Sequence, residues 1–455
     1  MDRRKFLIAS AAALASRRRI AAAAAVRRAP RPRPTAAQLR WQRDELAIFL
    51  HFGINTFTDR EWGDGREDPK IFAPDALDAR QWARVARAAG FRAMILTAKH
   101  HDGFCLWPTA TTQHSIASST FRGGEGDVVR EFVDACRAFG LRPGLYLSPW
   151  DRNHPAYGDS PRYNDVYATQ LTELLTRYGP IAEVWFDGAN GEGPNGKRQV
   201  YDWPRVFSLV RRLQPEAVIF SDAGPDIRWC GNERGTAGDP NWSTVDPNAV
   251  PYPGASGVGV TAALQHGDPL GTVWRPAEVD VSIRPGWFYH SAEDGKVRTG
   301  ADLQQLYVQS VGRNAKLLLN VPPTRAGLLG DHDIASLAEF RRRLDHDASR
   351  AARPPVLSRV GESATGIDIE LASRTPVDAV RLAENIEHGQ RVARYTVSGL
   401  TLSGWRLLSK GSTIGYAKID RFAPVAVGRV RLEIEEALER PLGLTTTVFE
   451  HAPGA

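Results

Sequence analysis

The sequence has few cysteines, no long hydrophobic run and no nucleotide-binding loop. Its three cysteines, Cys105, Cys136 and Cys230, form no CxxC pair, and an odd, sparse set excludes a disulfide framework. No apolar run beyond the amino terminus is long enough to span a bilayer, which excludes a transmembrane helix there. A GxGxxG motif is missing after the first expected strand, so an open-sheet nucleotide enzyme is disfavoured.

The basic charge is concentrated at the amino terminus. Residues 1–40 hold ten arginines, one lysine and one aspartate, a net charge of +10 against +6 for the whole chain. The remaining residues therefore carry a net charge of −4. The basic isoelectric point comes from this segment and does not indicate a nucleic-acid partner.

The amino-terminal segment has the features of an export signal. Arg3 and Arg4 precede a small apolar run at 8–15, and the alanines at 21–25 offer cleavage sites. We expect residues 1–38 to be a twin-arginine signal followed by a linker rich in arginine, proline and alanine. The mature protein is then periplasmic or extracellular, with no membrane attachment after cleavage.

Between residues 39 and 345, short apolar segments alternate with amphipathic ones. The expected strands are 46–52, 93–97, 144–147, 182–186, 217–220, 279–283 and 316–321, and the expected helices are 78–89, 128–139, 164–178, 203–213 and 301–313. Gly90, Gly140 and Gly179 follow three of these helices, as a left-handed residue after a helix requires. Strands buried on both faces and alternating with helices predict a parallel sheet. At this length we expect an α/β fold, a (β/α)8-like TIM barrel.

The pattern changes to short, evenly spaced strands over residues 350–455. We expect strands at 366–370, 379–382, 392–400, 405–408, 414–419 and 430–435, which together predict a carboxyl-terminal β-sandwich. The sandwich either supports the barrel or binds carbohydrate. Support is favoured, because no exposed aromatic platform is evident in its sequence.

The ends of the expected barrel strands carry candidate catalytic residues, because catalytic groups of such barrels lie at the carboxyl ends of strands. His51 lies at the end of an expected strand, and the adjacent pair His100 and His101 and Asp187 follow expected strands. Trp185 and Asp187 are two residues apart, so their side chains point to one face. An aromatic ring beside a carboxylate suits a sugar, although Asp187 could equally cap a following helix.

The adjacent histidines allow a metal or a sugar site. Neighbouring histidines on a strand diverge, and the sequence has no HxH or HExxH pattern. We therefore expect His100 and His101 to bind hydroxyl groups, and no metal. A structural polar cluster is the remaining alternative.

A glycosidase needs a second carboxyl group. Four acids are candidates: Glu192, Asp222, Glu233 and Glu278. Glu233 is the preferred one, because it lies between two glycines near Trp229, in a loop expected after strand 217–220, where desolvation can raise its pKa. A solvated loop acid is the alternative. Glu278 starts a strand, nearer the opposite end of a parallel barrel, and Glu192 lies in a glycine-rich loop.

Several motifs together resemble one enzyme family. They are His51-Phe52-Gly53, Glu61-Trp62-Gly63, Lys99-His100-His101-Asp102-Gly103-Phe104, Trp185-Phe186-Asp187-Gly188-Ala189 and Trp287-Phe288-Tyr289, with Gly389 to Val392 and Thr413 to Tyr416 in the sandwich. Over residues 41–323 the chain resembles the α-L-fucosidases of glycoside hydrolase family twenty-nine.

That resemblance implies a retaining exo-glycosidase acting on a fucosylated oligosaccharide or glycoconjugate, without a cofactor. Asp187 matches the family's nucleophile. The residues matching its fucose pocket are His51, Glu61, Trp62, His100, His101, Trp185 and Trp287. The segment from Gly231 to Gly235 resembles the subfamily that prefers α1,3/α1,4-linked fucose, which makes Glu233 the acid/base. A non-catalytic sugar-binding barrel and a metal-dependent hydrolase are the rival functions, and the oligomeric state is not indicated.

Overall fold

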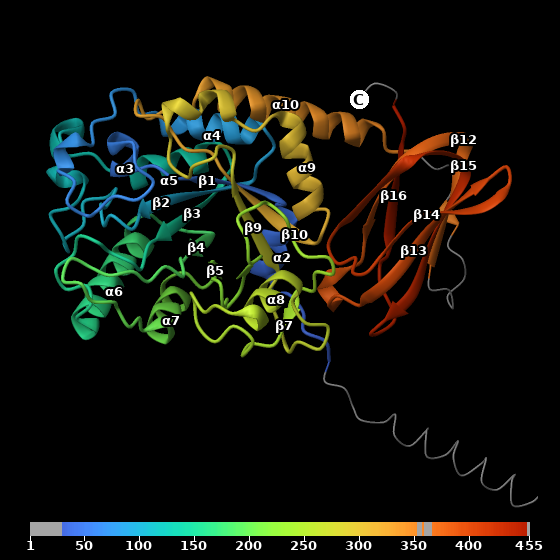
Figure 1. Ribbon diagram of the computed structural model, residues 1–455, viewed down its shortest axis with the longest axis horizontal. Helices are drawn as coiled ribbons and strands as arrows, with labels where there is room; N and C mark the ends of the chain where they lie inside the picture. The colour runs from blue at the N-terminus through green and yellow to red at the C-terminus, as the bar shows by residue number, and fades with distance from the viewer. Residues whose placement is uncertain (1–29, 353–356, 359–365, 453–455) are drawn as a thin grey trace, which may run out of the picture. The chain divides into compact units, whose positions relative to one another are not determined.

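The computed structural model describes residues 30–352, 357–358 and 366–452 (Figure 1). Residues Pro32–Ala455 form one compact unit. The expected export signal lies outside the described residues, which begin within the expected linker at residue 30. Among the described residues, no helix combines the length and the apolar character needed to cross a membrane.

Eight parallel strands form the barrel. They are β1 (Leu46–Leu50), β2 (Ala93–Lys99), β3 (Arg142–Leu147), β4 (Glu183–Trp185), β5 (Val218–Phe220), β6 (Arg228–Trp229), β9 (Ala277–Ser282) and β10 (Ala315–Asn320). Their order is β5-β4-β3-β2-β1-β10-β9-β6, and a single parallel bridge between Phe220 and Ile227 joins the two ends. This arrangement confirms the predicted (β/α)8-like barrel.

Helices lie between the strands and around them (Figure 1). The α-helices are α2 (Ala36–Arg43), α3 (Ile54–Thr58), α4 (Ala79–Ala88), α5 (Val128–Ala138), α6 (Ser160–Arg177), α7 (Trp203–Leu213), α8 (Val258–His266), α9 (Gly300–Ser310) and α10 (Asp331–Ser349). Short 3-10 helices occupy Pro69–Ile71, Ile116–Ser118, Phe121–Gly124, Ser291–Lys296 and Ile386–His388. Gly90, Gly140 and Gly179 have φ of 92°, 65° and 71°, which confirms the predicted helix ends.

Several features of the barrel differ from the prediction, since helices α2, α3, α8 and α10 and strand β6 were not predicted. Helix α2 begins at Ala36, so residues 36–38, expected to belong to the linker, are helical. Thr35 and Gln38 form a capping box there, and Gln38 is buried, donating to the carbonyl oxygens of Asp226 and Trp274. Strand β6 was not predicted because two residues give no periodicity to recognise.

The carboxyl-terminal part is an antiparallel β-sandwich, as predicted. Its strands are β11 (Leu357–Ser358), β12 (Gly366–Ala383), β13 (Val392–Thr401), β14 (Gly404–Gly411), β15 (Lys418–Ala437) and β16 (Thr445–Glu450). The order is β11-β12-β15-β13-β14, with β16 paired to β12. A separate pair, β7 (Thr244–Val245) and β8 (Val273–Trp274), lies between barrel segments of the sequence.

The predicted sandwich strands are wrong in two places. The segments 366–370 and 379–382, expected as separate strands, belong to the single strand β12. The segment 414–419 begins with a turn in which Gly415 has a φ of 65°, and strand β15 starts only at Lys418. The Cβ of any other residue at Gly415 would lie 2.3 Å from the side chain of Asn314, so the turn is shaped by contact with the barrel.

Candidate active site

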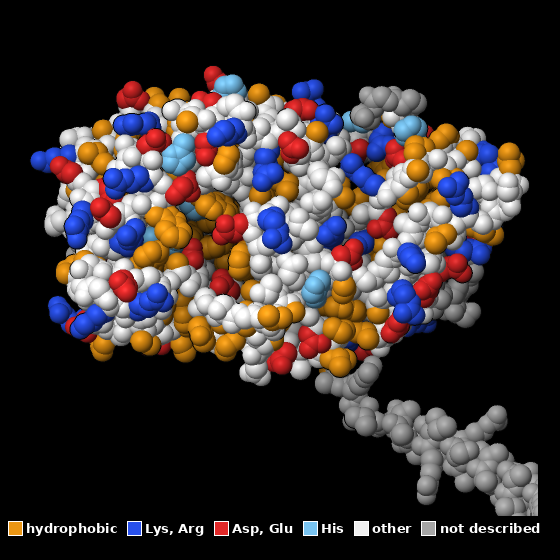
Figure 2. All heavy atoms as spheres, in the orientation of Figure 1, with side chains coloured by type: hydrophobic (Ala, Val, Ile, Leu, Met, Phe, Trp, Pro, Cys, Tyr) orange, Lys and Arg blue, Asp and Glu red, His pale blue; other side chains and the backbone are white. Residues whose placement is uncertain are grey.

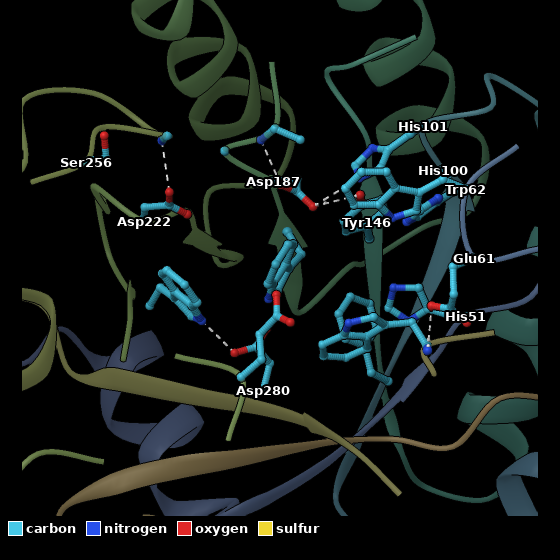
Figure 3. A pocket seen from close by; sticks show the side chains of 18 of the residues that line it. His51, Glu61, Trp62, His100, His101, Tyr146, Asp187, Asp222, Ser256 and Asp280 are labelled. Atoms are coloured by element: carbon cyan, nitrogen blue, oxygen red, sulfur yellow. Dashed lines mark hydrogen bonds and ion pairs between the residues drawn. The ribbon is translucent and has the colours of Figure 1, made fainter. Parts of the chain in front are cut away.

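A pocket of about 420 Å³ opens at the carboxyl ends of the barrel strands. It is lined by Phe49, His51, Glu61, Trp62, His100, His101, Tyr146, Trp185, Asp187, Gly188, Ala189, Asp222, Trp229, Glu233, Gly254, Ala255, Ser256, Asp280 and Trp287. Figure 2 shows hydrophobic side chains gathered over the barrel, with acidic side chains among them. Every residue predicted for the site lines this pocket, and Figure 3 shows how several of them face one another.

Asp187 follows β4 and points into the pocket (Figure 3). Its Oδ1 accepts from the backbone N–H of Ala189 at 2.8 Å, and its Oδ2 accepts from the Tyr146 hydroxyl at 3.0 Å. The Nε2 of His101 lies 3.8 Å from the same Oδ2. Two donors hold the carboxylate in one orientation while its side chain stays 29% exposed toward the pocket.

Glu233 lies in the loop after β6, not directly after β5 as expected. Its side chain is exposed at the pocket opening. Partial burial raises the pKa of Glu233, the charge of Asp187 raises it further, and a hydrogen bond from Trp287 lowers it. Glu233 and Asp187 both line this pocket.

The other candidate acids differ in position. Asp222 lines the pocket and accepts from the N–H of Gly254 at 2.9 Å, and burial raises its pKa to about 6. Glu192 is exposed and outside the lining. Glu278 is fully buried in β9 and does not line the pocket, in agreement with its expected place toward the opposite end of the barrel.

Asp280 is a pocket residue that the sequence reasoning missed. Burial raises its pKa to about 8, with a further contribution from Glu233. Its Oδ1 accepts from the indole N–H of Trp229 at 2.7 Å. The signal was available: in Glu278-Val279-Asp280-Val281-Ser282 the polar residues alternate, so they point to one face of the strand.

Asn320, at the end of β10, determines the tautomer of His51. Its Oδ1 accepts from the backbone N–H of His51 at 3.2 Å and contacts the ring Nδ1 at 2.8 Å. Its amide donates to Ser282 Oγ and to the carbonyl of Trp287. Since Oδ1 is an acceptor, His51 Nδ1 carries the hydrogen. Burial lowers the pKa of His51 to about 3, so Nε2 is free to accept a hydrogen bond.

His100 and His101 are both buried beside His51. The Oγ of Ser148 lies 2.7 Å from Nδ1 of His101 and donates to the carbonyl of Trp150, so it accepts from His101. Burial lowers the pKa of both histidines. Nδ1 of His100 is buried without a hydrogen-bond partner, and such an atom is usually satisfied by a ligand or by water. Within the described residues, no group of three acidic, histidine or cysteine side chains could hold a metal ion.

Glu61 anchors the loop that carries Trp287. Its carboxylate accepts from the backbone N–H groups of Trp287 and Phe288, at 2.8 and 3.0 Å. His290 Nε2 lies 2.8 Å from the same carboxylate. Glu61 therefore lines the pocket and also positions one of its aromatic walls.

Three tryptophans form much of the apolar wall. Trp287 lies 5.0 Å from His51 between ring centroids, and Trp62, 59% exposed, contacts His101 edge to face. Trp185 stacks on Phe220 with centroids 4.0 Å apart. Flat apolar surfaces beside buried polar atoms are suited to the C–H and O–H faces of a sugar ring.

A buried charged group supports the floor of the pocket. The indole N–H of Trp185 donates to Glu278 Oε2 at 3.1 Å. Lys316 Nζ lies 3.1 Å from Glu183 Oε2 and 3.6 Å from Glu278 Oε1. All three charged side chains are almost fully buried in the barrel, so the group is held below the site and cannot contact a ligand in the pocket.

The pocket therefore holds two acids in different surroundings, three buried histidines whose pKa values are lowered, and an apolar wall. A carboxylate held by two donors can attack an electrophilic carbon, and an acid with a raised pKa in the same pocket can donate a proton. Tyr146, Asn320 and Asp280 complete this arrangement, although the motif analysis did not select them.

The comparisons agree with this chemistry. A family model described as Alpha-L-fucosidase matches residues 66–346. The chain is 42% identical over 444 residues to Alpha-L-fucosidase 1 of Arabidopsis thaliana, covering 90% of this chain and 86% of that one.

Two solved structures extend the agreement to the whole fold. A glycoside hydrolase 29 family member from an unknown rumen bacterium has a TM-score of 0.86 and 38% identity, covering 93% of this chain and 78% of that one. A Ruminococcus gnavus GH29 fucosidase in complex with fucose has a TM-score of 0.81 and 29% identity, covering 93% and 97%. With its motifs, its barrel and its pocket in agreement, the chain belongs to the α-L-fucosidases of glycoside hydrolase family 29.

Proposed function

We propose that this α-L-fucosidase is a retaining exo-enzyme that removes terminal α1,3- or α1,4-linked L-fucose, with Asp187 as nucleophile and Glu233 as acid/base. One observation carries the mechanism: both carboxyl groups line one pocket, and the charge of Asp187 raises the pKa of Glu233. This difference in environment is what a nucleophile and a proton donor require.

In the first step, an oxygen of Asp187 bonds to the anomeric carbon while the glycosidic C–O bond breaks. Glu233 gives its proton to the leaving oxygen, so the aglycone departs as a neutral alcohol. In the second step, water attacks the anomeric carbon, Glu233 takes a proton from that water, and the bond to Asp187 breaks. Two displacements at one carbon give net retention of configuration.

The remaining pocket residues bind the sugar in this proposal. Nε2 of His51 accepts from a sugar hydroxyl, and His100 and His101 offer further buried ring nitrogens. Trp62, Trp185 and Trp287 form the apolar wall. No step calls for a metal or a cofactor.

Asp187→Ala tests the nucleophile. Turnover should fall about a thousandfold or more, because removal of a covalent catalyst typically costs on that scale. Azide should restore part of the activity and yield a glycosyl azide. Near-normal turnover of the variant would contradict the assignment and would leave a non-catalytic role for the carboxylate.

Glu233→Ala tests the acid/base. Natural glycans should lose more activity than aryl fucosides, whose good leaving groups need little protonation. Glu278→Ala is the matched comparison, since Glu278 was the competing candidate. Equal losses on both substrates for Glu233→Ala would reject Glu233 as the proton donor. So would a larger loss on natural glycans than on aryl fucosides in Glu278→Ala.

The linkage preference rests on the resemblance of the segment around Glu233 to the α1,3/α1,4 subfamily. Hydrolysis of matched α1,2-, α1,3-, α1,4- and α1,6-fucosides tests it directly. Faster cleavage of the α1,2 or α1,6 compounds would remove the subfamily assignment while leaving the fucosidase assignment intact.

A further inference from the structure

We propose that the β-sandwich positions the loop that carries Glu233, and that Gln390 is the positioning residue at this contact. The inference rests on the proposed acid/base role of Glu233. It gives the carboxyl-terminal domain a part in the reaction, whereas the sequence only favoured general support of the barrel.

The loop between β6 and β7 is closed at its base. Arg228, at its start, donates from Nη2 to Oδ1 of Asn241, near its end, at 2.7 Å. Both side chains are buried, with exposures of 2% and 1%. Glu233 therefore lies on a segment whose two ends are joined to each other, so movement at Asn241 is passed to the base of the loop.

Side chains of the sandwich form hydrogen bonds with the backbone at the base of this loop. Gln390 Oε1 accepts from the N–H of Ser243 at 2.7 Å, and its Nε2 donates to the carbonyl of Asn241 at 3.0 Å. Thr413 Oγ1 accepts from the N–H of Asn241 at 2.9 Å. Gln390 is fully buried, so no water can take over these bonds without a change of structure.

A second set of contacts fixes the middle of the loop. Arg313, just after α9, donates from Nη1 to the carbonyl of Ala237 at 3.0 Å, and it pairs with Lys418 of the sandwich in an isolated bridge. Lys418 also forms an ion pair with Asp239 at 2.5 Å. The loop is thus held by the barrel and the sandwich together from Ala237 onward.

Proton donation depends on this placement. A general acid must lie within hydrogen-bond reach of the leaving oxygen, and small displacements of catalytic groups cost large factors in rate. Close to Glu233 the loop is also held by side chains: Asn232 Nδ2 donates to the carbonyl of Thr236 at 2.9 Å, and Gln265 Nε2 donates to the carbonyl of Cys230 at 2.8 Å. The side chain of Glu233 itself is exposed. The barrel holds the loop close to Glu233 and the sandwich holds its carboxyl-terminal end, so loss of the Gln390 contacts would loosen the loop and shift Glu233.

The test compares Gln390→Leu with wild type on two substrates, 4-nitrophenyl α-L-fucoside and a fucosylated trisaccharide. We expect kcat/KM to fall about tenfold or more on the trisaccharide and only about twofold on the aryl fucoside, because the aryl leaving group needs little proton donation. Val427→Ala is the control, since Val427 is fully buried in the sandwich core and makes no contact with the loop among those described. It should destabilise the sandwich and change both substrates equally.

A double-mutant cycle separates this inference from the proposed function. If Gln390 acts through Glu233, then adding Gln390→Leu to Glu233→Ala should not further increase the difference between the losses of kcat/KM on the trisaccharide and on the aryl fucoside. A larger loss on the trisaccharide than on the aryl fucoside in Glu233→Ala, but not in Gln390→Leu, would overturn the positioning role alone. Equal losses on the two substrates in Glu233→Ala would overturn the acid/base assignment, and with it the inference that rests on it. If Gln390→Leu does not fold, Thr413→Val removes the neighbouring acceptor and is measured in the same way.

Discussion

Lys316 is the only positive charge among the described residues that contacts the two buried carboxyl groups below the pocket. Its Nζ lies 3.1 Å from Glu183 and 3.6 Å from Glu278, and the three side chains are 1%, 3% and 0% exposed. Burial raises the pKa of Glu278 well above its usual range, the charge of Glu183 raises it further, and Lys316 lowers it. Removing Lys316 therefore leaves Glu278 with a still higher pKa.

We expect Lys316→Met to destabilise the fold by about 3–5 kcal/mol near neutral pH, the cost of breaking a buried ion pair by removing one partner. The sign of the pH dependence follows from linkage. A group whose pKa is raised in the folded state contributes stability below its unfolded pKa and loses it as the pH rises through the folded pKa. The unfolded chains titrate alike, so the deficit of the variant relative to wild type should grow as the pH rises through the raised folded-state pKa of Glu278.

Urea unfolding followed by circular dichroism, at several pH values, measures this deficit. Adding Glu183→Gln to Lys316→Met should recover part of the loss at high pH, because one buried negative charge is removed while an acceptor remains for the Trp41 indole, 2.9 Å from Glu183. A deficit that is the same at every pH, or no deficit, would refute the reasoning that the lysine compensates buried carboxylates.

Three further outcomes are expected. Glu61→Gln should raise KM by several-fold with a smaller effect on kcat, because the acceptor for the Trp287 N–H weakens and the pocket wall shifts; an unchanged KM on steady-state kinetics would contradict this. Chelation should leave activity unaltered and elemental analysis should find no stoichiometric zinc, whereas a bound ion at the adjacent histidines would overturn their assignment to sugar binding. Arg3→Lys with Arg4→Lys should retain the precursor in the cytoplasm, as fractionation would reveal, and unchanged export would reject a twin-arginine signal.

Much of the barrel was predictable because its signals are local. The strand at 46–52 is nearly all apolar, and Gly90, Gly140 and Gly179 end their helices through their own backbone freedom. Strand β6 was not predictable, because two residues give no periodicity and the strand is defined only by its pairing with β9, about 50 residues later in the sequence. The turn at Gly415 was predicted as strand, because its shape depends on a contact with Asn314, 101 positions earlier in the chain.

The sequence by itself determined which residues are available for chemistry. Trp185 and Asp187 lie two apart at a strand end, so both had to face the same side, and the motif order identified the family. Only the tertiary structure decided which acidic side chains line the same pocket. It placed Glu233 and Asp187 in the lining of one pocket, added Asp280 from β9, and kept Glu278 in the core outside that pocket. The physical reason is that side-chain periodicity acts over a few residues, whereas the distance between two strand ends depends on how the whole barrel closes.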